Sequence, residues 1–148
     1  KITKYANQEA FLKGTPFECL EFDGNVLLNE GITELLKLLI GAAATPYNNA
    51  NASIGVGDSD TEASATQTGL LGANKAWLSM DDGYPSVSDQ TVTFRGTADG
   101  DTANFAWEEA TVVNGEDDTG DNLNRKVRDM GTKASGTIWT AELKITIS

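Results

Sequence analysis

The most strongly patterned part of the chain is Leu27-Leu28-Asn29-Glu30-Gly31-Ile32-Thr33-Glu34-Leu35-Leu36-Lys37-Leu38-Leu39-Ile40-Gly41. Its apolar residues recur at the spacing of one helix face, at positions Ile32, Leu35, Leu36, Leu39 and Ile40. Asn29 can cap the first turn, and Gly41 offers the left-handed conformation that ends many helices. Leu28 and Leu38 widen the apolar surface further. We therefore expect a helix near residues 29–40 that other structure largely covers.

The chain after this helix has the alternating pattern of strands. Strands are expected near residues 52–57, 75–80, 90–95, 103–107, 111–113, 125–130 and 137–148. Asp99-Gly100 is a hairpin signal between the strands at 90–95 and 103–107. The last strand alternates most clearly, with Trp139, Ala141, Leu143, Ile145 and Ile147 facing inward. The pattern predicts a mainly β (α+β) fold, an antiparallel β-sandwich or jelly-roll-like domain over residues 24–148 packed around one α-helix.

Residues 1–23 precede this domain and read as an extended N-terminal arm. Their apolar residues lack a sustained period, apart from a short strand expected at residues 17–22. An arm with this many large apolar side chains would be a sticky surface if it were free. It therefore packs either on its own domain or on a neighbouring subunit. The candidate partner-binding residues are Tyr5, Phe11, Leu12 and Phe17.

Charge and composition exclude several classes of function. The formal charge is −11, from 22 acidic and 11 basic residues, which disfavours binding to nucleic acid. No stretch approaches the roughly 20 apolar residues of a membrane span, so no membrane contact is expected. Cys19 is the single cysteine and there is no histidine. A disulfide framework within the chain, histidine-based triads and the usual zinc sites are thereby excluded.

Two acidic segments invite a metal-binding interpretation. Asp58-Ser59-Asp60-Thr61-Glu62 alternates like the first half of a calcium loop. It lacks the glycine at the sixth position and has Gly69 where the twelfth position needs a bidentate glutamate. The second cluster, in an acidic loop, is Glu116, Asp117, Asp118 and Asp121. A solvated turn and a mobile loop are the simpler interpretations, so no metal and no cofactor are expected.

Glu108 and Glu109 form a pair of carboxylates that suggests a glycosidase. Neighbouring residues of a strand point to opposite faces, so the two cannot flank one bond without a bulge. An inward glutamate beside Trp107 needs a base to offset its burial, and Arg125 and Arg128 are the candidates for this structural ion pair. No nucleophile has a base beside it. We therefore predict that the chain is not an enzyme, with a hydrolase using Glu108 or Glu109 as an alternative.

The order of motifs resembles a group of small virion structural proteins of tailed bacteriophages, which includes capsid decoration (cement) proteins and tail-associated proteins. The resemblance covers roughly residues 24–148. It rests on Asn25-Val26-Leu27-Leu28-Asn29-Glu30-Gly31, Ile54-Gly55-Val56-Gly57-Asp58, Thr66-Gln67-Thr68-Gly69-Leu70-Leu71-Gly72, Phe105-Ala106-Trp107-Glu108-Glu109 and the segment from Arg125 to Lys133. It implies a structural role for Glu109 and does not separate capsid from tail.

These observations lead to one expected function and two alternatives. The leading expectation is a decoration protein on the outer capsid surface of the virion, made in the host bacterial cytoplasm. Its partners would be the major capsid protein and copies of itself, with a trimer as the candidate assembly. A tail or tail-fibre component is the first alternative. A carbohydrate-binding module is the second, with a stacking platform drawn from Trp77, Tyr84, Trp107 and Trp139.

Overall fold

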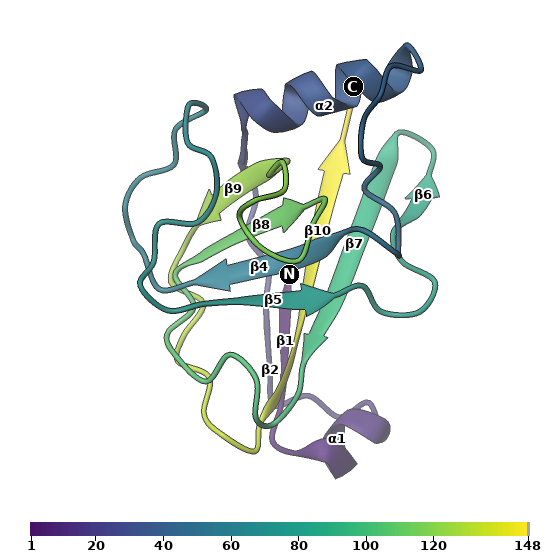
Figure 1. The fold of residues 1–148 in the computed structure, drawn as a ribbon. Helices are drawn as coiled ribbons and strands as arrows, with labels where there is room; N and C mark the ends of the chain where they lie inside the picture. Colours follow the sequence, from purple (N-terminus) through teal and green to yellow (C-terminus); the bar gives the residue numbers. More distant parts are fainter. Residues whose placement is uncertain (148) are drawn as a thin grey trace.

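The computed structural model describes residues 1–147 and arranges them as two antiparallel sheets of five strands each (Figure 1). The first sheet has the order β2 (Glu18–Leu20), β1 (Ile2–Tyr5), β10 (Ile138–Thr146), β7 (Thr91–Ala98), β6 (Ser86–Ser88). The second has the order β3 (Val26–Leu27), β9 (Asn124–Val127), β8 (Glu109–Val113), β4 (Ser53–Gly57), β5 (Lys75–Ser79). The predicted mainly β sandwich is confirmed.

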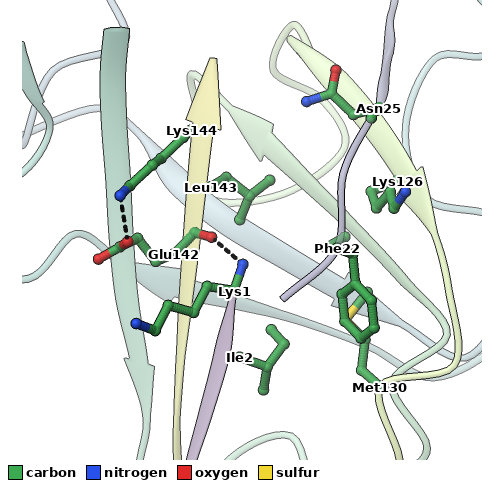
Figure 2. A pocket seen from close by; sticks show the side chains of 11 residues that line it. Lys1, Ile2, Phe22, Asn25, Lys126, Met130, Glu142, Leu143 and Lys144 are labelled. Atoms are coloured by element: carbon green, nitrogen blue, oxygen red, sulfur yellow. Dashed lines mark hydrogen bonds and ion pairs between the residues drawn. The ribbon is translucent and has the colours of Figure 1, made fainter. Parts of the chain in front are cut away.

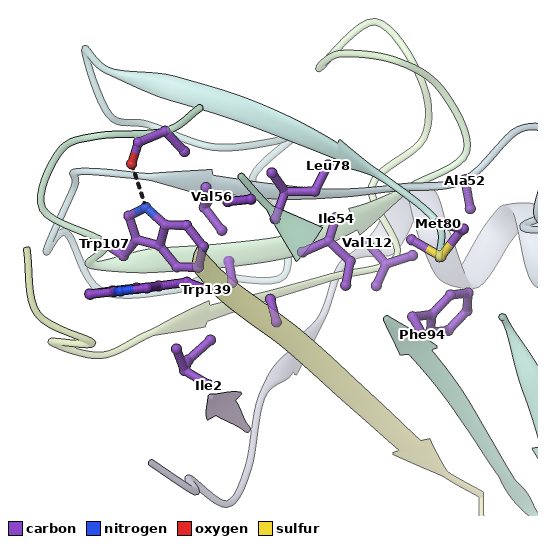
Figure 3. Close-up of a cluster of buried hydrophobic side chains, with 14 of the residues drawn as sticks. Ile2, Ala52, Ile54, Val56, Leu78, Met80, Phe94, Trp107, Val112 and Trp139 are labelled. Atoms are coloured by element: carbon purple, nitrogen blue, oxygen red, sulfur yellow. Dashed lines mark hydrogen bonds between the residues drawn. The ribbon is translucent and has the colours of Figure 1, made fainter. Parts of the chain in front are cut away.

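One apolar core fills the space between the sheets, whose strands run across each other (Figure 1). The second sheet contributes Ile54 and Val112, and the first contributes Phe94 (Figure 3). At one side of this core the rings of Trp107 and Trp139 meet edge to face, with centroids 5.0 Å apart. The Trp107 Nε1–H donates to the carbonyl oxygen of Ala103, so its buried polar atom is satisfied.

The strands with the clearest alternation form where the sequence places them, except for the strand expected at residues 103–107. That segment carries one isolated bridge, between Ala106 and Thr132. β7 pairs instead with β10 along its whole length and with β6 on its other side. The turn signal fails because the Asp99 carboxylate accepts bonds from the backbone N–H groups of Asp101 and Thr102, which holds an open loop.

The predicted helix forms as α2 (Asn29–Leu39), but the expectation that it is largely covered is wrong. Leu28, without a side-chain cap bond, occupies the N-cap position expected for Asn29, and Gly41 has the expected left-handed φ of 70°. α2 lies at one end of the sandwich (Figure 1) and buries Gly31 and Glu34, while four large apolar side chains on α2 and at its C-cap stay exposed: Ile32, Leu36, Leu39 and Ile40.

The N-terminal segment packs on its own domain, the first of the two alternatives. β1 lies between β2 and β10, and Ile2 is in the core. A short helix, α1 (Gln8–Leu12), follows β1 at the end of the sandwich away from α2 (Figure 1). Residues 1–23 therefore contribute strands to the first sheet as well as the candidate partner-binding residues.

Candidate functional site

The candidate partner-binding residues gather around α1, and we call Tyr5, Phe11, Leu12 and Phe17 the α1 end. The rings of Tyr5 and Phe11 meet edge to face with centroids 5.2 Å apart, and both are half-buried. The side chains of Leu12 and Phe17 are 75% and 60% exposed. The α1 end therefore offers two free apolar side chains, with an aromatic pair beside them.

Local sequence fixes the geometry of this end. The Asn7 side chain caps α1 by accepting from the backbone N–H of Ala10, at 2.9 Å. Gly14 then turns the chain with a φ of 65°. The backbone N–H of Phe17 donates to the carbonyl of Lys4, which leads the chain into β2. β2 is an edge strand that pairs with β1 alone among the described residues, so its outer edge is open.

A second apolar surface lies on α2, and we call Ile32, Leu36, Leu39 and Ile40 the α2 stripe. The buried side of the helix is set by Gly31, at which an added Cβ would lie 2.4 Å from the Cα of Leu123. It is also set by Glu34, which accepts from the backbone N–H of Thr45 at 2.6 Å. Because successive residues of a helix are about 100° apart, Leu36 lies on the side of the helix away from Gly31 and Glu34. Sequence reasoning placed these residues in the core and so missed this surface.

Glu109 and Arg125 form an ion pair, and both side chains are fully buried. The Arg125 Nε and Nη2 atoms each lie 2.7 Å from Glu109 Oε2. The other predicted candidate, Arg128, lies elsewhere, with its guanidinium carbon 5.6 Å from the ring centroid of Phe22. The structure thus brings Glu109 together with Arg125 and not with Arg128.

This ion pair fastens the long loop between β4 and β5 to the second sheet. The backbone N–H groups of Leu71 and Gly72 donate to Glu109, at 3.0 and 2.7 Å to Oε1. Arg125 Nη1 donates to the carbonyl of Thr61 at 2.8 Å and to the side chain of Gln67. Glu109 is enclosed by donors of its own chain, which gives it a structural role and no access to a substrate.

The neighbouring Glu108 has a different environment. It is half-buried, and burial together with the charges of Asp129 and Asp60 raises its pKa. Because Glu109 is engaged by Arg125 and the loop, Glu109 and Glu108 do not form a pair of carboxylates facing one bond.

The acidic loops use their carboxylates to hold the backbone. Asp58 accepts from both the backbone and the side-chain nitrogen of Asn74. Asp118 accepts from the backbone N–H of Leu70 at 3.0 Å and pairs with Lys75 at 2.8 Å. Within residues 1–147, no group of three or more histidine, cysteine or acidic side chains is placed to hold a metal ion.

Of the four aromatic residues proposed as a stacking platform, two are buried and two are half-buried. Trp107 and Trp139 are buried in the core and cannot stack on a ligand. Trp77 and Tyr84 are half-buried, and the guanidinium carbon of Arg95 lies 5.7 Å from the Tyr84 ring centroid.

A small hollow opens between the two sheets (Figure 2). Its volume is about 90 Å³, below the roughly 300–1,000 Å³ of ligand pockets. Ile2, Phe22 and Leu143 form its apolar floor, and Lys126 and Lys144 lie at its rim. Lys144 pairs with Glu142 at 3.4 Å.

Searches with protein-family models, curated proteins and solved structures find no significant match to this chain. Neither helix within residues 1–147 has the length and apolar composition that crossing a membrane requires.

Proposed function

We propose that this chain is a bacteriophage virion structural protein, a decoration (cement) protein that binds the outer surface of the assembled capsid. In this proposal it is made in the host bacterial cytoplasm, and it acts by binding rather than by catalysis. The observation that carries the proposal is the α1 end, where Leu12 and Phe17 are exposed and Phe17 directly precedes the open edge strand β2.

The attachment has a plain physical basis. The open edge of β2 can add a strand of the major capsid protein through main-chain hydrogen bonds. Leu12 and Phe17 then supply apolar anchors, which gain roughly 1.5–3 kcal/mol each when they leave water. The α1 end is mounted on a sheet that reaches the core, so these anchors are held in place before binding.

The test uses purified phage heads that lack the protein. The Leu12→Ser/Phe17→Ser double variant is expected to lose cosedimentation with the heads, while the wild type saturates them. Val87→Ser is the matched control, because Val87 is 75% exposed on β6, the opposite edge strand of the same sheet.

A reconstruction of the saturated heads should show density for the chain on the outer shell, with the α1 end toward the coat. Binding of the double variant at the wild-type level would contradict the proposed attachment surface. Labelling of tails in place of heads would favour the tail or tail-fibre alternative.

A further inference from the structure

The side chain of Asn114, which directly follows β8, joins three segments of the chain. Its Oδ1 accepts from the backbone N–H of Asp121 at 2.7 Å, which closes the loop between β8 and β9. Its Nδ2 donates to the carbonyl oxygen of Thr45 at 2.9 Å and lies 3.5 Å from Glu34 Oε1 on α2. Asn114 is only 6% exposed. We call Glu34, Thr45, Asn114 and Asp121 the Asn114 junction.

The residue after Asn114 gives this asparagine a particular reactivity. Asn114-Gly115 is the one place in the sequence where glycine follows asparagine. Glycine has no side chain to shield its backbone nitrogen. That nitrogen can therefore reach the side-chain carbonyl carbon of the preceding asparagine and close a five-membered ring, a reaction made fast by proximity.

We propose that Asn114 is a deamidation site, which the folded state protects and whose product weakens the Asn114 junction. The Gly115 backbone nitrogen gives up its proton to hydroxide and attacks Cγ of Asn114. As the new C–N bond forms, the side-chain nitrogen leaves as ammonia. Water then opens the succinimide to aspartate or isoaspartate, so the net change is one water consumed and one ammonia released. This goes beyond the proposed function, because the reaction needs no partner.

The junction holds the side chain back from this reaction. Ring closure makes Cγ tetrahedral, which pulls Oδ1 and Nδ2 out of line with Asp121 and Thr45. Hydroxide and water must also reach a buried residue. The reaction therefore waits for the loop between β8 and β9 to open, and its rate falls with the fraction of molecules in which the loop is open.

The product of the reaction fits the junction poorly. A carboxylate at position 114 can still accept from the Asp121 N–H, but it has an oxygen where Nδ2 was a donor. That oxygen faces the carbonyl oxygen of Thr45 and the buried carboxylate of Glu34. Acceptors and like charges that meet in a poorly solvated place repel each other. Isoaspartate also adds one carbon atom to the main chain at the end of β8.

Peptide mapping by mass spectrometry, after incubation at mildly alkaline pH, measures the reaction. The wild type unfolded in guanidinium chloride should accumulate aspartate and isoaspartate at position 114. The folded wild type should react at least about tenfold more slowly.

Gly115→Ala is the matched control, because its methyl group shields the attacking nitrogen while Asn114 keeps its bonds. The added Cβ would lie 3.3 Å from the Cα of Gly120, a contact that a small shift relieves. The unfolded Gly115→Ala chain should deamidate at least about tenfold more slowly than the unfolded wild type. Equal rates in the folded and unfolded wild type, or equal rates in the two unfolded chains, would overturn the proposal.

Thermal melts measure the effect of the product. Asn114→Asp should lower the midpoint of unfolding by at least about 3 °C. Asn25→Asp is the matched control, since Asn25 is exposed and the change in charge is the same. The reacted wild-type chain gives the comparison without a substitution, because after refolding it should unfold at a lower denaturant concentration than the unreacted chain. An Asn114→Asp variant as stable as Asn25→Asp, or a reacted chain as stable as the unreacted one, would overturn the proposed effect.

Discussion

At the scale of single residues, Glu109 and Glu108 are adjacent in sequence, but the structure stabilises the charge of Glu109 and disfavours the charge of Glu108. Glu109→Gln would leave the Arg125 guanidinium buried without its counter-charge. We expect it to lower the free energy of unfolding by roughly 3–5 kcal/mol, measured by urea denaturation. Glu108→Gln is the matched control and should change stability by less than about 1 kcal/mol, because its surroundings disfavour the charge. Equal stability of the two variants would contradict the structural role of the ion pair.

Glu34 makes the stability of the packing around α2 depend on pH. The backbone N–H of Thr45 lowers the pKa of Glu34, and Lys37 adds to this effect against the opposing effect of burial. A lowered folded-state pKa contributes stability above the unfolded-state pKa, and this contribution is lost as the pH falls through the folded-state pKa. Glu34→Gln should therefore be less stable than the wild type at neutral pH, and the difference should shrink in acid. Thermal melts across this range measure it, and a difference that does not change with pH would argue against this assignment.

At the scale of elements, the close packing of α2 on the segment around Leu123 requires a glycine at position 31. An added Cβ on Gly31 would lie 2.4 Å from Leu123 Cα and 2.6 Å from the carbonyl oxygen of Asn122. Gly31→Ala gains about 1 kcal/mol of helix propensity. It should still destabilise the protein by about 1–3 kcal/mol, because backbone atoms cannot move aside cheaply. Thr33→Ala on the exposed side is the control and should be neutral or slightly stabilising. A Gly31→Ala variant more stable than the wild type would show that the helix can shift outward.

The helix and the long strands could be predicted from sequence because their signals are local. Alternation along residues 137–148 is enough to recover β10, although Ile147, expected to face inward, lies beyond the end of the strand and is exposed. β1 was not predicted as a strand, because its four residues are defined by pairing with residues 138–141 at the other end of the chain. The sequence also does not show which side of α2 is buried. Glu34 is buried because Thr45 and Asn114 supply donors to it, and no periodicity shows that.

For the candidate site too, part of the geometry can be predicted from the sequence and part cannot. An inward glutamate on a strand requires a base, and this much is readable from the sequence. The choice of base depends on the register between β8 and β9. Glu109 pairs with Val127, so Arg125, two residues before Val127, shares a face with Glu109. Arg128 comes one residue after Val127 and beyond the end of β9, and so cannot reach Glu109.

At the scale of the whole molecule, the first and last strands of the chain pair with each other. β1 and β10 are neighbours in the first sheet, with Ile2 opposite Ala141. The Lys4 ammonium lies 4.2 Å from the ring centroid of Trp139 and pairs with Glu18 of β2. The segment that carries the proposed attachment surface is therefore also part of the sheet. Its role in binding has to be separated from its role in folding.

Deleting residues 1–6 removes all of β1, so it should cost the protein its fold. Ile2 leaves the core, β2 loses its only partner among the described strands, and β10 gains an unpaired edge. We expect the truncated chain to lose its cooperative thermal transition. The Leu12→Ser/Phe17→Ser variant should keep the wild-type transition, because both side chains are exposed. A cooperative transition and a dispersed NMR spectrum in the truncated chain would show that residues 1–6 are dispensable for folding. Loss of particle binding on truncation would then report attachment alone.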